Sequence, residues 1–226
     1  QALAAFSLAS AVHSVFASAA IPVVYLVLAY VQDRRTLHRL TLFGTSIITG
    51  ILTLVFLVSF TSLGDWIFGT LLGGSEEVVR QARTAFLVLS LVLPPMLLRD
   101  LCMGLVMRAR RTMLSTYGIL LRLAVMGLVL PWLPRFVDGA VVGAFAFLIS
   151  MSAEATFMVV VTRPYYKQLG SSDAPPLSYW VMVMFGWPLA ASHLTESGLL
   201  MVVNFFLGQL PDSDRAQGAF LVVTSL

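Results

Sequence analysis

Long apolar runs separated by short polar connectors dominate the sequence. A helix that crosses a bilayer needs about 20 mainly apolar residues, and six segments of the chain meet this requirement. The runs are continuous and lack the alternation of apolar and polar residues that is typical of membrane β-barrel strands. The pattern therefore predicts an all-α, polytopic transmembrane helix bundle. The predicted spans are 2–31, 37–62, 84–107, 112–133, 138–162 and 178–208, and a seventh begins near 215.

The composition agrees with this prediction. Of the 226 residues, 58% are hydrophobic and 11% are charged, whereas soluble domains carry about 25% charged residues. The mean hydropathy is +0.90. The single cysteine, Cys102, excludes a disulfide framework and a cysteine metal cluster. The pI near 9.4 requires no nucleic-acid partner, because the arginines are concentrated in particular connectors.

Prolines and the ends of the sequence predict bends and boundaries. Pro22, Pro94, Pro95 and Pro188 fall inside predicted spans, where a missing N–H and a bulky ring bend a helix. The first span begins next to Gln1 and the last apolar run continues to the end of the sequence. We therefore expect the chain to be a fragment of a longer protein. The Pro- and Ser-rich connector 163–177 is expected to separate two bundles.

Basic residues predict the orientation in the membrane. The connectors after the first, third and fifth spans hold eight Arg and Lys residues, and the alternate connectors hold four. Because cytoplasmic loops carry an excess of Arg and Lys, the loops near 32–39, 108–111 and 163–177 are predicted to be cytoplasmic. We expect a multi-pass protein of a bacterial cytoplasmic (inner) membrane. In this orientation the first span runs inward, so one further helix is expected before Gln1.

Five charged residues lie well inside the predicted spans. Each costs about 2.5–3.5 kcal/mol at mid-helix on insertion scales, and such groups normally face a bundle interior or a water-filled cavity and pair with one another. His13 and His193 add two titratable groups at similar depth. These positions are therefore candidates for a substrate or charge pathway. The five charged residues are Arg99, Asp100, Arg122, Glu154 and Glu196.

The sixth span carries the clearest polar stripe. His193, Glu196, Ser197 and Asn204 follow helical spacing and are predicted to share one face. Glu154 and Glu196 are the preferred transport candidates, because a buried carboxylate can exchange a proton or a cation at neutral pH. His193 and Glu196 are spaced for metal ligation, but two ligands without further partners favour no metal site.

A purely structural role is the main alternative for the charges. An ion pair that joins two helices explains Arg99, Asp100 and Arg122 as well as a transport role does. Adjacent residues on a helix point about 100° apart, so Arg99 and Asp100 are not expected to face one partner. We expect Arg99 to face a cavity and Asp100 to bond to a neighbouring helix. The sequence holds no GxxxxGK[ST] phosphate loop and no HExxH zinc motif, so we predict that the protein is not an enzyme.

The segment 83–160 resembles the progressive ankylosis transporter family of the MATE-like superfamily, which comprises multidrug, oligosaccharidyl-lipid and polysaccharide flippases. Three features carry the resemblance. They are the proline-containing helix with Arg99, the sequence LLRLAV around Arg122, and the sequence GAVVGAFAFLISMSAEATFMVV around Glu154. The sequence LSYWVMVMFGWPLAASHLTESGLLMVVNFFLGQLP is similar to the long helix that opens a lobe in this family.

The resemblance implies twelve helices in two six-helix lobes, with substrate bound near the midplane. On that template, 1–168 would hold helices two to six of the first lobe, 169–177 the inter-lobe linker, and 178–226 helix seven and part of helix eight. The implied function is alternating-access export of an anionic or lipid-linked solute, coupled to H⁺ or Na⁺ and without another cofactor. The alternative is a non-transporting helical subunit that packs in a larger membrane complex.

Overall fold

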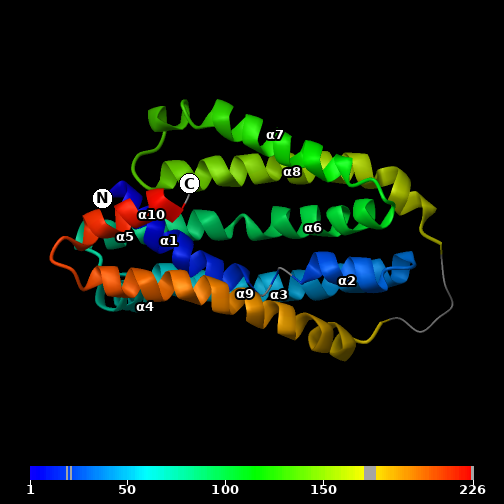
Figure 1. Cartoon of the computed structure of the whole chain (residues 1–226), viewed down its shortest axis with the longest axis horizontal. Coiled ribbons are helices and arrows are strands. Elements are labelled where there is room, and N and C mark those ends of the chain that lie inside the picture. The colour runs from blue at the N-terminus through cyan, green and yellow to red at the C-terminus, as the bar shows by residue number, and fades with distance from the viewer. Residues whose placement is uncertain (19, 21, 171–176, 225–226) are drawn as a thin grey trace.

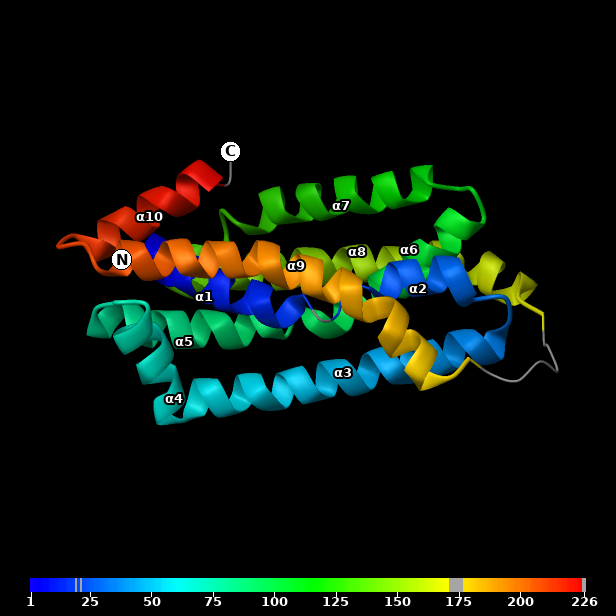
Figure 2. The ribbon, with the colours of Figure 1, turned by 60° about the horizontal axis from the view of Figure 1, so that its bottom comes forward.

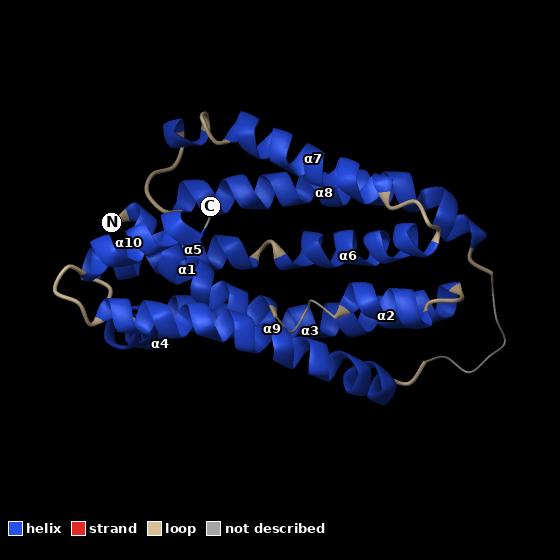
Figure 3. Cartoon of the chain, in the orientation of Figure 1, coloured by secondary structure: helices blue, strands red, loops and turns tan. Residues whose placement is uncertain are grey.

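The computed structural model describes residues 1–18, 20, 22–170 and 177–224, and in that part of the chain every regular element is helical (Figure 3). The helices are α1 Ala2–Ala17, α2 Val23–Tyr30, α3 Arg34–Phe60, α4 Ser62–Asp65, the π-helical η1 Trp66–Leu71, α5 Glu76–Ser90, α6 Leu93–Arg108, α7 Met113–Val129, the 3₁₀-helical η2 Leu133–Arg135, α8 Val141–Gln168, α9 Tyr179–Gly208 and α10 Ser213–Thr224.

Five helical segments are long and apolar enough to cross a membrane. The predicted all-α, membrane-spanning class is therefore confirmed, and the chain is an integral, multi-pass membrane protein. The five segments are Arg34–Phe60, Glu76–Arg108, Met113–Arg135, Val141–Gln168 and Tyr179–Gly208.

The first predicted span, 2–31, consists of two shorter helices instead of one. α1 ends at Ala17, and α2 begins at Val23 with Pro22 as its N-cap residue. The nitrogen of Pro22 has no hydrogen to donate to the carbonyl four residues earlier, so the helical ladder stops there. A second interruption, between α5 and α6, immediately precedes Pro94 and Pro95. Pro188, by contrast, lies inside α9, which continues through it.

The long helices run side by side along the longest axis of the molecule (Figure 1, Figure 2). α1 packs against α5, α9 and α10, and α2 packs against α6. α8 packs against both α5 and α6 on one side and against α7 on another. α3, α7 and α9 are the outer helices, because little of their apolar surface is covered by the rest of the described chain.

Small residues allow the central helices to approach closely. Ala4, Ala5 and Ala9 of α1 are fully buried, as are Ala82 and Ala85 of α5. Small side chains are typical of contacts between membrane helices, where close backbone packing replaces the hydrophobic driving force. The α1–α5 contact therefore forms the centre of the bundle.

One end of the bundle is organised around the start of α3. Asp33 is the N-cap residue, and its carboxylate accepts a hydrogen bond of 2.7 Å from the backbone N–H of Thr36. The next residue, Arg34, donates from its backbone to the Gly170 carbonyl at 3.2 Å and from its side chain to the Lys167 carbonyl at 2.9 Å. These bonds join two of the arginine-rich connectors. The predicted inter-lobe linker, 169–177, lies largely outside the described residues.

The opposite end contains a close backbone crossing between the loop after η1 and the end of α9. A Cβ atom on Gly73 would collide with the Gly208 carbonyl oxygen, and a Cβ atom on Gly208 would collide with the Leu72 carbonyl oxygen. Gly73 also has φ +68°, in the left-handed region that favours glycine. Ser75 donates a 2.9 Å hydrogen bond to Asp214, which fixes the start of α10 to the same loop.

Candidate functional site

Four of the charged residues that lie inside spans come together on α6, α7 and α8. We call them the charge cluster. Two are acidic and almost completely buried, since the side chains of Asp100 and Glu154 are 3% and 2% exposed. Two are basic and partly accessible, since Arg99 and Arg122 are 18% and 24% exposed. The formal charge of the cluster is zero, which reduces the cost of placing charges at membrane depth.

Arg99 and Asp100 bond to each other instead of to other helices. The Arg99 Nε and Nη2 atoms lie 2.8 and 2.5 Å from the Asp100 Oδ1 atom. Asp100 was expected to bond to a neighbouring helix, but it accepts these hydrogen bonds from Arg99 on its own helix. The long arginine side chain folds back along α6, so the 100° angle between adjacent positions does not keep the two groups apart.

Arg122 and Glu154 form an ion pair across the α7–α8 interface. The Arg122 Nη1 atom lies 3.3 Å from the Glu154 Oε2 atom, and this oxygen is buried without a partner at hydrogen-bonding geometry. α7 and α8 are in close contact here, because a Cβ atom on Gly118 would lie 3.3 Å from the Met158 Sδ atom and 3.4 Å from the Glu154 Cγ atom. This pair is therefore more loosely held than the Arg99–Asp100 pair.

The two pairs lie on adjoining helices. α6 packs against α8, and Asp100 and Glu154 carry like charges on the two sides of this interface. Protonation or cation binding at either carboxylate would relieve the repulsion between these like charges and would release an arginine to bind an anion. The cluster therefore has the groups needed to exchange a cation against an anion.

The predicted polar stripe on α9 divides into two environments. Asn204 is buried, accepts a 3.2 Å hydrogen bond from the Ser7 hydroxyl on α1, and contacts Gln217 of α10 through its backbone carbonyl. His193 and Glu196 lie 3.6 Å apart on an open face, with side chains 35% and 79% exposed. The structure therefore does not bring His193 or Glu196 to the charge cluster. Asn204 joins helices inside the bundle.

His13 also lies away from the charge cluster. It is buried between α1 and α5, where its Nδ1 atom is 3.4 Å from the Ser90 hydroxyl. Cys102, on α6, is a free, partly buried thiol. Among the described residues, no three His, Cys, Asp or Glu side chains are grouped closely enough to hold a metal ion.

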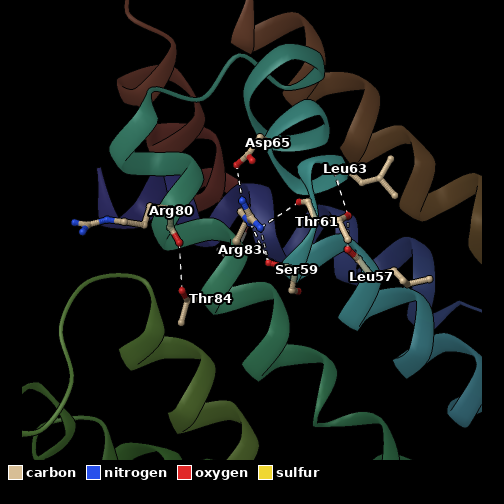
Figure 4. Close-up of polar contacts among 8 residues, drawn as sticks. All are labelled: Leu57, Ser59, Thr61, Leu63, Asp65, Arg80, Arg83 and Thr84. Atoms are coloured by element: carbon tan, nitrogen blue, oxygen red, sulfur yellow. Dashed lines mark hydrogen bonds and ion pairs between the residues drawn. The ribbon is translucent and has the colours of Figure 1, made fainter.

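The sequence did not single out Arg83, which organises the opposite end of the molecule (Figure 4). Its guanidinium donates to the Ser59 carbonyl from Nε and Nη2 at 3.1 and 2.7 Å, and to the Thr61 carbonyl at 3.1 Å. Its Nη1 atom lies 2.6 Å from Asp65. Free carbonyls at a helix end attract cations. A basic residue later in the chain than the end of α3 was therefore the feature of the sequence that could have identified the role of Arg83.

A cavity of about 1100 Å³ borders this arginine, between the end of α3, η1 and the start of α5. Its charged lining comes from α4 and α5, and Arg80 pairs there with Glu77 at 2.6 Å. No member of the charge cluster lines this cavity.

Comparison with known proteins identifies no relative. No protein-family model, no curated protein and no solved structure matches this chain. The resemblance to the progressive ankylosis family therefore remains a prediction from the sequence pattern.

Proposed function

We propose that this protein is a secondary-active transporter of the MATE-like flippase superfamily, located in a bacterial cytoplasmic membrane. It would export an anionic or lipid-linked solute by alternating access, coupled to H⁺ or Na⁺. The observation that carries the proposal is the Arg122–Glu154 pair, which combines a buried carboxylate with a partly accessible arginine inside a membrane span.

The geometry supports different roles for the two ion pairs. Asp100 accepts two hydrogen bonds from Arg99, so the two opposite charges mainly neutralise each other and hold α6 in place. The Glu154 Oε2 atom has no hydrogen bond of its own, so its contact with Arg122 is the one that exchanges partners. In this mechanism a proton or Na⁺ binds Glu154 while an anion binds Arg122.

The outer position of α7 supports this exchange. α7 packs mainly on α8, and only 11% of the most apolar stretch of its span is buried within the described chain. A small displacement of α7 from α8 would separate Arg122 from Glu154 without disturbing the α1–α5 core. Such a displacement is the step at which the substrate would enter or leave.

The test is transport by the purified chain in proteoliposomes, with a panel of radiolabelled carboxylate and phosphate anions and a proton-sensitive dye inside the vesicles. Glu154→Gln should lower anion uptake and proton movement by about tenfold or more, because an amide cannot take up the proton that is coupled to transport. Arg80→Gln is the matched control, because Arg80 is an exposed surface residue, and it should leave transport unchanged.

The double variant Arg122→Gln/Glu154→Gln separates transport from folding. Replacing both members of a buried pair is often neutral for stability, whereas removing one partner leaves a buried charge unpaired. We expect the double variant to regain the thermal stability that Glu154→Gln loses but to remain inactive. A double variant that transports normally would contradict the assignment of these residues.

A non-transporting subunit of a larger membrane complex is the second candidate. It is favoured by the observation that both ion pairs form within the described chain while an exposed Glu196 lies inside the α9 span. In that case neither Glu154→Gln nor the double variant would affect any transport by the proteoliposomes, and Glu196→Ala would weaken assembly with a partner.

A further inference from the structure

A largely apolar groove runs along the outer surface between the α5–α6 bend and α8. Its volume is about 430 Å³. One wall consists of Leu91, Pro94, Pro95 and Leu98, and the other consists of α8 side chains from 148 to 163. At 1.5 Å per residue, the α8 wall is about 22 Å long. The groove is thus longer than one leaflet of a hydrocarbon core that is about 30 Å thick.

The groove exists because the helix opposite α8 is bent. The interruption of the helical ladder before Pro94 and Pro95 turns α6 relative to α5. Leu91 and Leu98, on either side of the prolines, are 39% and 47% exposed. Exposed apolar side chains therefore line the groove on both sides of the interruption.

The hydroxyl groups in the groove are already satisfied. Ser152 donates a 2.7 Å hydrogen bond to the Leu148 carbonyl, and Thr156 donates a 2.8 Å hydrogen bond to the Ser152 carbonyl. Because both hydroxyls bond back to their own helix, the groove offers its occupant carbon surface. That surface suits a hydrocarbon chain.

The groove ends at an arginine. Arg163 is exposed, and in the described part of the chain it makes no hydrogen bond, ion pair or aromatic contact, unlike Arg34 and Arg83. It belongs to the arginine-rich end of the bundle, where α3 begins. An arginine beside lipid tails is costly unless its guanidinium reaches an anion at the membrane surface.

We infer that this groove binds one acyl chain of an anionic phospholipid, whose phosphate is held by Arg163. The apolar walls match the chain, and the unpaired guanidinium matches the phosphate. The lipid comes from the leaflet at the arginine-rich end. Arg163 lies nine residues after Glu154, which places it on the opposite side of α8, so this site is separate from the charge cluster.

The test uses the purified full chain with phosphatidylglycerol that carries a photoreactive diazirine in its acyl chain. Phosphatidylcholine with the same acyl chains serves as the uncharged-headgroup comparison. Cross-links located by mass spectrometry should fall within 148–163 and should be about fivefold more frequent with phosphatidylglycerol, the ratio expected for one arginine–lipid contact. Arg163→Gln should remove this preference, whereas Arg111→Gln, an exposed arginine outside the groove, should retain it.

A second pair of variants tests the groove itself. Thr156→Trp fills the groove from an exposed position, so it should abolish cross-linking without disturbing the core, and Leu128→Trp on the open face of α7 should have no effect. Equal labelling of Thr156→Trp and the unaltered protein would overturn the inference. So would a headgroup preference that survives in Arg163→Gln, or displacement of the phospholipid by a polyprenyl phosphate probe, which would make the groove a path for a lipid-linked substrate.

Discussion

The carboxylate of Asp33 fixes the first turn of α3 and responds to pH. Hydrogen bonds from the Thr36 hydroxyl and backbone N–H lower the pKa of Asp33 below its usual value, because they favour the ionised form. The folded-state pKa is therefore below the unfolded-state pKa. The stabilisation is complete above the unfolded value, near 3.8, and is lost as the pH falls through the lower folded value.

Asp33→Ala should therefore lower the free energy of unfolding by about 1 kcal/mol at pH 7, the usual value of an N-cap. The difference from the unaltered protein should shrink as the pH falls below about 4, and thermal unfolding in detergent at several pH values measures it. Asp33→Asn is the control, because asparagine caps without ionising. A difference between Asp33→Ala and the unaltered protein that stays constant down to pH 2 would contradict the ionised cap.

Single residues also show where sequence reasoning ends. Arg99, Asp100, Arg122 and Glu154 could be located inside apolar spans because charged residues are rare there. Their pairing could not be predicted, because it depends on how closely α7 approaches α8 and on the rotamer of the Arg99 side chain. Glu196 had the same sequence signal as Glu154, yet it lies on an open face.

Elements are joined at their ends by a few side chains, and Arg83 is the clearest example. It closes the end of α3 from α5 by bonding the carbonyls of Ser59 and Thr61. Its partner Asp65 is 60% exposed, so the ion pair contributes little and the carbonyl bonds contribute most.

Arg83→Ala should lower the free energy of unfolding by about 2–3 kcal/mol, because charged hydrogen bonds to backbone carbonyls are lost. Arg83→Lys should recover only part of this loss, since an ammonium group cannot donate in a fork as a guanidinium does. Asp65→Asn should cost less than about 1 kcal/mol. Thermal melts of the three variants provide the comparison, and equal losses in Arg83→Ala and Asp65→Asn would show that the carbonyl bonds are unimportant.

Apolar run length predicted the elements better than it predicted their continuity. Five spanning segments correspond to predicted spans, because a run of about 20 apolar residues has few alternatives to a membrane helix. Pro22 ends a helix, whereas Pro188 does not, although both lie inside apolar runs. The difference depends on whether neighbouring helices support the bent backbone, and sequence spacing does not contain that information.

For the whole molecule, the alternation of the helices places the arginine-rich connectors at one end and the acidic connectors at the other. The bonds from Arg34 to Lys167 and Gly170 join connectors of the first set, and the Ser75–Asp214 bond joins connectors of the second set. We propose from the positive-inside rule that the first end faces the cytoplasm.

Cysteine labelling tests this orientation. With Cys102→Ala as background, a cysteine introduced at Ser75 should react with a membrane-impermeant maleimide in intact cells, whereas one introduced at Ala109 should react only after the membrane is opened. Both positions are in connectors, so neither substitution alters a spanning segment. The reverse labelling pattern would show that the protein has the opposite orientation in the membrane. The lipid bound at Arg163 would then lie in the other leaflet.

The glycine crossing at Gly73 and Gly208 limits how α9 can move. Backbone atoms meet there without intervening side chains, so α9 cannot slide along its axis at that point. Most of the surface of α9 is uncovered by the described chain. Its Tyr179 end contacts Arg39 and Phe43 through its ring, and Arg39 also donates a 3.0 Å hydrogen bond to the Leu177 carbonyl. The motion left to α9 is rotation about the crossing. A rotation by a small angle there displaces the Tyr179 end of the helix most.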